Sequence, residues 1–436
     1  MSGLPLALLL AVPAPLHESA FRLEQPAEVV ATVTAGCEGC DWGARGREAA
    51  VLSLAVDGRY SQHVVLFRGE GADYPVLLGP LDSGEHRLAL SLDTRRSARA
   101  IGPVRVAGVA VSAVGAGLPG HEALAHAPLL HARRHSVERF TDLPLLAWVE
   151  TRPTDRGREL LYSVVFSHED GGTPADRLMA TWGRVTDIEL VYTVELDAAG
   201  LVVREEYQGR DHVVEPFRGL KEGRHPVLHV VTKNNMVSDH GPSTPRLAPA
   251  PVAFALDRVS REAVMDAHPW TYRVSAREVR RQGRVAASAE PGSKRIPDPK
   301  RFGYVEACGA VGDARLAFDV AVPQGAGLAW LASDGGRPDF RVGRSGCFRA
   351  AVALPPGRSV AEIRAVRFRA HTRPPRKGER ALPRGSGWAR LERVNLLFGL
   401  GADDLPLPSV LSWSGSADLA PDGAGFEVPL GGAGPP

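Results

Sequence analysis

Short apolar runs separated by turns dominate the first quarter of the sequence. These runs cover residues 29–33, 49–56, 63–67, 86–92 and 104–111. Turn-forming pairs such as Asp57-Gly58 lie between them. Five or more strands at such close spacing are typical of a β-sandwich, because each strand must bury one face against a second sheet. We therefore predict an N-terminal β-sandwich accessory domain over residues 21–114.

The same pattern returns in the last third of the chain. Apolar runs occupy residues 315–322, 347–354, 362–371 and 388–398, with proline- and glycine-rich loops between them. This pattern predicts a C-terminal β-sandwich over residues 301–422. Residues 423–436 are predicted to be a flexible tail, since their Gly and Pro content offers little to bury. The expected fold class is mainly β, with multidomain β-sandwiches and a few short helices.

The length of 436 residues exceeds one ordinary domain and suits two or three. Glycines and a proline over residues 115–120 mark a linker. A central β-sandwich with the candidate site is predicted after it, over residues 121–256. Ser260 and Ser275 each open a short helix, so residues 257–300 are predicted to form a helical hinge.

A buried strand over residues 160–166 is the feature around which the central region is organised. It is rich in β-branched and aromatic residues and ends at a His and two carboxylates, residues 168–170. A second strand begins at Asp187, and its apolar residues alternate with polar ones, which predicts that only one face is buried. Between the strands, Thr173 as N-cap and Gly183 past the end predict a two-turn helix.

Three carboxylates are expected to converge where these strands meet: Asp170, Asp187 and Glu189. Carboxylate oxygens are the ligands that calcium and magnesium prefer, so these three are the candidate metal ligands. Paired carboxylates also serve as acid and base in enzymes that cleave glycans. A third interpretation is that they are solvated surface groups.

Polar and basic side chains of the central region form the candidate ligand-binding set. The region holds most of the 14 histidines, and its strand over residues 225–231 runs into a polar loop. The candidate residues are His168, Arg184, His212, His225, Asn234, Asn235 and Asp239. The alternative is that the Asn and Asp residues only form the turn.

Converging carboxylates need a compensating positive charge, because like charges within a few Å repel one another. Arg184 stands three residues before Asp187, and a guanidinium matches a carboxylate with two hydrogen bonds. We expect Arg184, with a neighbour such as Arg210, to supply this charge in place of a metal ion.

The four cysteines fall into two separated pairs, Cys37 with Cys40 and Cys308 with Cys347. This spacing predicts two disulfides in an exported protein. A zinc site built from both pairs is the alternative.

The compartment is predicted from the start of the chain and from its charge. An apolar run with a Val-x-Ala end lies within residues 1–20, which predicts a signal segment and a secreted, periplasmic or cell-surface protein. Lys and Arg total 52 against 50 Asp and Glu, so nothing indicates nucleic-acid binding. No apolar run is long enough for a transmembrane segment.

The order of segments 161–166, 183–189 and 223–227 resembles the layout of the necrosis- and ethylene-inducing peptide-like cytolysins, and of vacuolar-sorting-like β proteins that share an Asp-x-Glu strand. The resemblance covers residues 125–245. It implies a secreted β-sandwich that binds a divalent cation and sphingolipid sugar head groups, with Asp187 and Glu189 as ligands.

The chain departs from the cytolysin motif at three positions. Arg184 and Thr186 stand where the motif has histidines, and Ile188 stands where it has Trp. Arginine cannot ligate a metal ion. The resemblance therefore implies the fold, whereas it does not imply cytolysis.

These patterns predict an exported binding protein whose central domain takes a carbohydrate-like or lipid head-group ligand, with or without a divalent cation. One alternative is a polysaccharide-active hydrolase or lyase that uses the central carboxylates and a histidine. The other alternative is a structural surface protein.

Overall fold

A computed structural model describes residues 14–288 and 294–429, and the chain forms two compact units. Unit 1 comprises residues 1–140, 219–229 and 240–250, and unit 2 comprises residues 141–218, 230–239 and 251–436. The described chain is mainly β, with six sheets and five short α-helices, as a fold of multidomain β-sandwiches requires. Most of the predicted signal segment, residues 1–13, lies outside the described residues.

Unit 1 contains the N-terminal β-sandwich. One of its sheets has the order β1 (His17–Leu23), β6 (Gly84–Leu92), β3 (Val51–Val56) and β4 (Arg59–Val65). The other has the order β5 (Ala72–Leu81), β2 (Ala27–Cys37) and β7 (Val104–Gly115). Every second residue of β2 from Val29 to Cys37 is buried, because alternate side chains face the opposite sheet.

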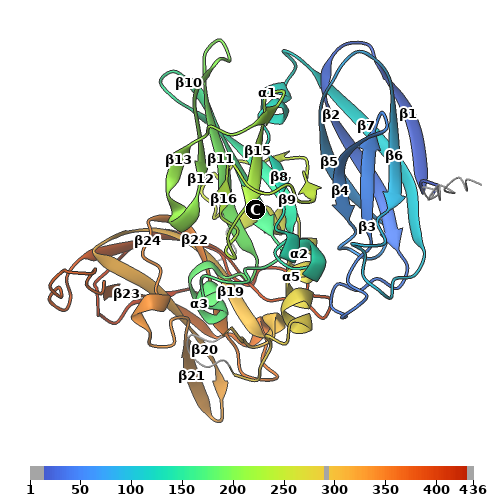
Figure 1. Ribbon diagram of the computed structural model, residues 1–436. Coiled ribbons are helices and arrows are strands. Elements are labelled where there is room, and N and C mark those ends of the chain that lie inside the picture. Colours follow the sequence, from blue (N-terminus) through green and yellow to red (C-terminus); the bar gives the residue numbers. More distant parts are fainter. Residues whose placement is uncertain (1–13, 289–293, 430–436) are drawn as a thin grey trace, which may run out of the picture. The chain divides into compact units, whose positions relative to one another are not determined.

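Short elements complete unit 1 (Figure 1). They are α1 (His121–Ala125), α2 (Arg134–Arg139) and the strands β8 (Leu129–His131), β14 (Lys221–Glu222), β15 (His225–Val230) and β17 (Arg246–Leu247). The pairing of β8 with β15 is parallel, whereas its pairing with β17 is antiparallel. Segments far apart in the sequence therefore form one small sheet.

Unit 2 begins with a six-stranded sheet. Its order is β13 (Val214–Pro216), β12 (Val202–Gln208), β11 (Asp187–Asp197), β10 (Gly157–Phe166), β9 (Pro144–Pro153) and β18 (Val252–Ala253). The α-helices of this unit are α3 (Ala175–Trp182), α4 (Ala263–Ala267) and α5 (Trp270–Arg281), and a short strand β16 (Val237–Ser238) also belongs to it.

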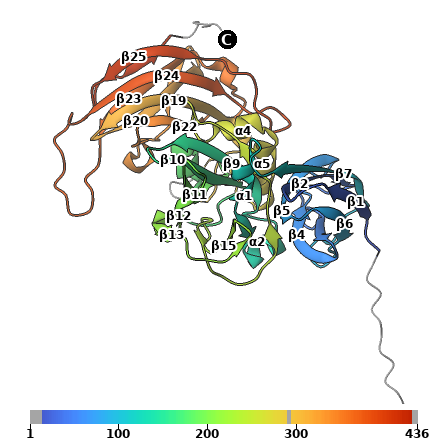
Figure 2. The ribbon, with the colours of Figure 1, turned by 90° about the horizontal axis from the view of Figure 1, so that it is seen from above.

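The C-terminal sandwich is also part of unit 2. Figure 2 shows its curved strands in orange and red. One sheet has the order β22 (Gly346–Ala353), β19 (Phe302–Gly312), β24 (Trp388–Phe398) and β25 (Trp413–Leu419). The other has the order β21 (Gly327–Ala332), β20 (Ala314–Gln324), β23 (Ala365–Thr372) and β26 (Phe426–Val428). Among the described residues of unit 2, 3-10 helices lie at Arg210–His212, between β12 and β13, and at Pro299–Arg301, Pro338–Phe340 and Val360–Glu362.

One hydrophobic core joins the six-stranded sheet to the C-terminal sandwich. Trp148 of β9 and Val264 of α4 are fully buried in the same cluster as Tyr304 of β19 and Phe398 of β24. Two helices lie in the region predicted as a hinge, and they contribute to this core. The predicted domain boundaries stay predictions, because the compact units are defined by contacts between segments distant in sequence.

Two predictions about local structure are wrong. The face of β11 expected to meet solvent is buried, since Val191 is 0% and Glu195 4% exposed. The strand lies inside the sheet between β10 and β12, with a bulge at Tyr162/Ser163 of β10. The predicted flexible tail includes β26, which pairs with β23, whereas residues 430–436 lie outside the described part.

The predicted helix over residues 173–183 is confirmed as α3, and Gly183 ends it in the left-handed conformation with φ 57°. Thr173 does not cap it. Both predicted disulfides, Cys37–Cys40 and Cys308–Cys347, are present. Within the described residues, no helix is both long and apolar enough to cross a membrane.

We expect Gly183→Ala to destabilise the protein more than Gly200→Ala. Both glycines have positive φ, so each substitution costs about 1 kcal/mol in backbone conformation. A Cβ at position 183 would also lie 2.6 Å from Cγ of Arg349, whereas a Cβ at 200 meets nothing within 4 Å. The crowding should add about 1–3 kcal/mol. Urea unfolding of both variants measures this, and equal losses would contradict it.

Candidate functional site

A polar cavity of about 340 Å³ lies within unit 2. It is lined from α3, from the start of β11, from the end of β12 and from segments next to β10, β16, α4 and β22. The charged and polar lining residues are Glu169, Thr173, Arg184, Asp187, Glu189, Gln208, His212, Asn234, Arg261, Glu262 and Arg344. Titratable groups that converge in a cavity mark it as the candidate site.

Asp187 and Glu189 enter the cavity from β11, as their alternation along the strand predicts. Asn235 Nδ2 donates to Asp187 Oδ2 at 3.0 Å, and Gln208 Nε2 donates to Glu189 Oε2 at 3.3 Å. A further hydrogen bond joins the two carboxyl groups, so one of them carries a proton. Such a pair offers both a donor and an acceptor.

The third carboxyl group in the cavity is Glu169, which sequence reasoning did not select. It follows β10 directly, and its Oε1 accepts a hydrogen bond from the Thr173 backbone N–H at 2.6 Å. Asp170 is not among the lining residues and accepts from Thr141 Oγ1 at 2.9 Å instead. Position 169 could have been found, because it is adjacent to Asp170 at the same strand end.

Burial controls the protonation of these carboxyl groups. Loss of hydration, with the nearby Asp187, raises the pKa of Glu169 to about 8 and that of Glu189 to about 9. Burial also raises the pKa of Asp187. Glu169 and Glu189 therefore keep their protons near neutral pH.

Arg184 is the internal cation that the sequence predicts. Its Nη1 lies 3.7 Å from Asp187 Oδ1, and its Nε donates to Glu262 Oε1 at 3.0 Å. Arg184 and the neighbouring Arg344 outweigh the burial that disfavours a charged Glu262, so the pKa of Glu262 is lowered. Arg210, the expected second cation, is exposed and does not line the cavity. Arg261 and Arg344 line it instead, and no pattern in the sequence indicates them.

Two more predicted residues line the cavity. His212 is exposed, and its Nδ1 accepts from Gln208 Nε2 at 2.7 Å and lies 3.8 Å from Glu189 Oε2. Asn234 is half-buried at the wall. These two residues add polar groups to the lining of the cavity.

The other predicted ligand-binding residues in unit 2 do not line the cavity. His168 donates from Nδ1 to the Val185 carbonyl at 2.7 Å. Burial and Arg284 lower its pKa to about 3, so it stays neutral. Asn235 is buried and holds Asp187, and Asp239 accepts from the Arg218 backbone N–H at 2.8 Å.

His225 belongs to unit 1 and is fully buried. Its Nδ1 donates to the Ala127 carbonyl at 2.9 Å, and its Nε2 lies 2.9 Å from Glu28 Oε2. These contacts tie the 219–229 segment to the N-terminal sandwich. Its environment is that of a structural histidine.

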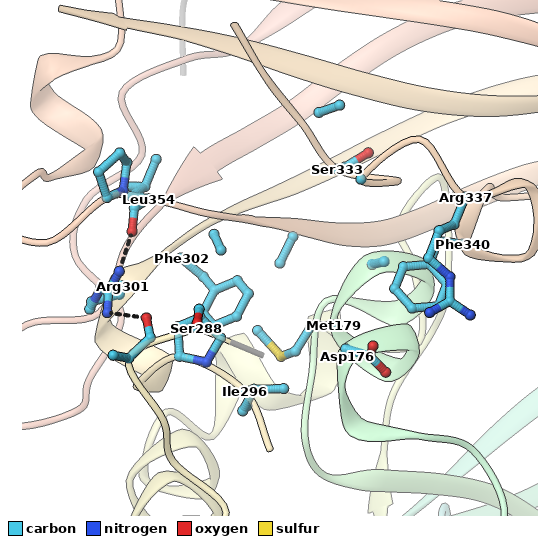
Figure 3. A pocket seen from close by; sticks show the side chains of 18 residues that line it. Asp176, Met179, Ser288, Ile296, Arg301, Phe302, Ser333, Arg337, Phe340 and Leu354 are labelled. Carbon is cyan, nitrogen blue, oxygen red and sulfur yellow. Dashed lines mark hydrogen bonds between the residues drawn. The ribbon is translucent and has the colours of Figure 1, made fainter. Parts of the chain in front are cut away.

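A second cavity of about 410 Å³ in unit 2 is mostly apolar. Figure 3 shows Met179, Phe302 and Phe340 around it, with Arg301 at one side. Arg301 donates to the Ala287 and Leu354 carbonyls at 3.0 and 3.1 Å. This cavity lacks a group of converging titratable side chains among the described residues, so the polar cavity is the candidate functional site.

The calcium or magnesium site predicted for Asp170, Asp187 and Glu189 stays a prediction. Across residues 14–288 and 294–429, no group of three or more His, Cys, Asp or Glu side chains is arranged to hold a metal ion.

Comparisons with known proteins bring no family assignment. No protein-family model matches the sequence, and no curated protein matches it significantly. The resemblance to the cytolysins stays a prediction.

The free energy of unfolding should fall as pH rises from about 5 to about 9. Glu169 and Glu189 bind protons more tightly in the folded state, because their pKa values are raised from 4.5 to about 8 and about 9. Each carboxyl group that stays protonated contributes at most about 1.4 kcal/mol per pH unit to this slope. Urea unfolding at several pH values measures it. Glu189→Gln should flatten the slope, and an unchanged slope would mean that Glu189 is ionised.

Calcium or magnesium added to chelator-treated protein should leave the melting temperature unchanged, because Arg184 already supplies positive charge beside Asp187. Arg184→His removes the guanidinium and offers a ligand, so its melting temperature should rise with added metal. Thermal scans with and without metal test this. If added metal raised the melting temperature of the wild type by several degrees, the wild type would bind the metal ion and the internal-cation interpretation would be wrong.

Proposed function

We propose that the polar cavity of unit 2 binds a carbohydrate-like ligand rich in hydroxyl groups. The observation that carries this proposal is the convergence of Glu169, Asp187 and Glu189 with raised pKa values in one cavity. A protonated carboxyl group can donate one hydrogen bond and accept others. A sugar hydroxyl also donates and accepts, so the two kinds of group are complementary.

The rest of the lining supports a polar ligand with an apolar face. Gln208 and Asn234 add amide groups that donate and accept. The half-buried ring of Trp182 offers apolar area next to these polar groups. The volume is at the small end of the range for ligand pockets. The sugar part of a lipid head group has the same hydroxyl chemistry and is included in the proposal.

A second candidate function is cleavage of a polysaccharide by hydrolysis or elimination. The hydrogen bond between Asp187 and Glu189 favours it, because one protonated and one ionised carboxyl group can act as acid and base. His212 lies 3.8 Å from Glu189 and could take part in proton transfer.

Export from the cytosol is part of the proposal. The two disulfides, Cys37–Cys40 and Cys308–Cys347, support it, because such bonds persist in oxidising compartments. The cytolysin resemblance would add a sphingolipid head group as a specific ligand.

A glycan array probed with the purified protein, with and without chelator, tests the proposal. We expect binding to a subset of glycans that survives chelation, since the described groups need no metal ion to hold hydroxyls. Glu189→Gln should weaken binding about tenfold, because a hydrogen-bonding group in the cavity is altered. Glu392→Gln is the matched control, since Glu392 is exposed on β24.

The outcomes separate the three function classes. Bound glycan that stays intact supports a binding protein, whereas shortened products identify a hydrolase or lyase. Absence of binding to any glycan by a folded wild-type protein would contradict both proposals and favour a structural surface protein.

A further inference from the structure

Arg261 is a wall residue of the polar cavity without a carboxylate partner. Its Nη2 donates to Ser163 Oγ at 3.2 Å, and its guanidinium lies 5.7 Å from the centre of the Trp148 ring. Among the described residues, no Asp or Glu oxygen lies within 4 Å of it. Burial, opposed by the more distant Glu189, lowers its pKa.

Arg344 also lines the polar cavity and also lacks a carboxylate partner among the described residues. Its Nη2 donates to the Thr181 carbonyl at 2.9 Å, and its guanidinium lies 5.6 Å from the centre of the Trp182 ring. In the part of the chain that the structure describes, it forms no ion pair. Burial and the neighbouring arginines lower its pKa, although Glu262 opposes this effect.

Other arginines of unit 2 are paired with carboxylates. Arg349 is 0% exposed and donates to Asp266 and Glu306, and Arg280 donates to Asp298 and Asp404. Buried charges are normally paired because the loss of hydration is costly. Arg261 and Arg344 are half-buried and donate only to neutral acceptors, so both guanidinium groups keep capacity for an anion.

The carboxyl groups of the cavity do not fill this capacity. Each of these carboxyl groups accepts a hydrogen bond from another residue. The Thr173 backbone N–H donates to Glu169, Asn235 Nδ2 donates to Asp187 and Gln208 Nε2 donates to Glu189. Glu262, in turn, is paired with Arg184. A carboxylate on the ligand would supply the partner that Arg261 and Arg344 lack.

We infer that the ligand of this cavity is an acidic sugar, whose carboxylate is held by Arg261 and Arg344. This inference rests on the proposed function and names the class of its ligand. A guanidinium matches a carboxylate with two parallel, charge-assisted hydrogen bonds. The hydroxyl groups of a uronic acid then face the carboxyl and amide groups around Glu189, and its ring can lie near Trp182.

Calorimetry with two matched pairs of probes tests the inference on the wild-type protein. The pairs are oligosaccharides of galacturonate and of galactose, and glucuronate-containing and glucose oligosaccharides. In at least one pair, the acidic member should bind about tenfold or more tightly, which corresponds to one charge-assisted hydrogen bond. Raised salt should reduce this preference. Sulfated galactose oligosaccharides form a third arm.

Two variants and a control locate the contact. Arg261→Gln and Arg344→Gln should each reduce binding of the preferred acidic probe about tenfold more than binding of its neutral counterpart. Arg390→Gln should change neither, because Arg390 is an exposed residue of β24 paired with Asp418. The wild-type comparison needs no variant, so a variant that fails to fold does not remove the test.

The outcomes separate this inference from the proposed function. Equal binding of neutral and acidic probes would overturn the inference and leave carbohydrate binding intact. Preference for the sulfated arm alone would overturn the assignment of a carboxylate. If no sugar of any arm binds to the folded protein, the proposed function itself fails.

Discussion

The buried ion pair between Arg184 and Glu262 is the interaction on which the candidate site depends. Arg184 follows Gly183 at the end of α3, and Glu262 stands at the start of α4, 78 residues later in the sequence. Both side chains are nearly inaccessible to solvent, at 7% and 4%. Removing one partner of such a pair typically costs about 3–5 kcal/mol, because the other charge is left uncompensated. The pair therefore links the segment after α3 to the start of α4, and both segments line the cavity.

The charges of the other carboxyl groups in the cavity depend on this pair. Glu262 compensates Arg184, and Arg184 in turn places positive charge beside Asp187. Asp187 and Glu189 share a hydrogen bond, so the cavity carries fewer negative charges than its carboxyl groups suggest. The same unit contains a larger apolar cavity around Phe302, which has no comparable convergence among the described residues. The residues that line the two cavities, and not the cavity volumes, identify the polar cavity as the candidate site.

Much of the fold follows from local patterns in the sequence. Short alternating runs such as that of β2 predict a sandwich, because strands with a period of two residues must bury one face. Gly183 predicts the end of α3, since glycine readily takes a positive φ. The cysteine spacing predicts both disulfides. The burial of both faces of β11 is not predictable, because its cover comes from distant segments.

The sequence by itself determined the strands, the helix α3 and the candidates Asp187, Glu189 and Arg184, since these depend on periodicity and short-range spacing. Only the tertiary structure decided which carboxyl group joins them, because Glu169 lines the cavity whereas its neighbour Asp170 accepts from Thr141 instead. It also brought to the cavity Arg261, Glu262 and Arg344, which follow Glu189 by 70 or more positions in the sequence. Contacts between such distant residues depend on how sheets and helices pack, and packing leaves no periodic signal in a single sequence.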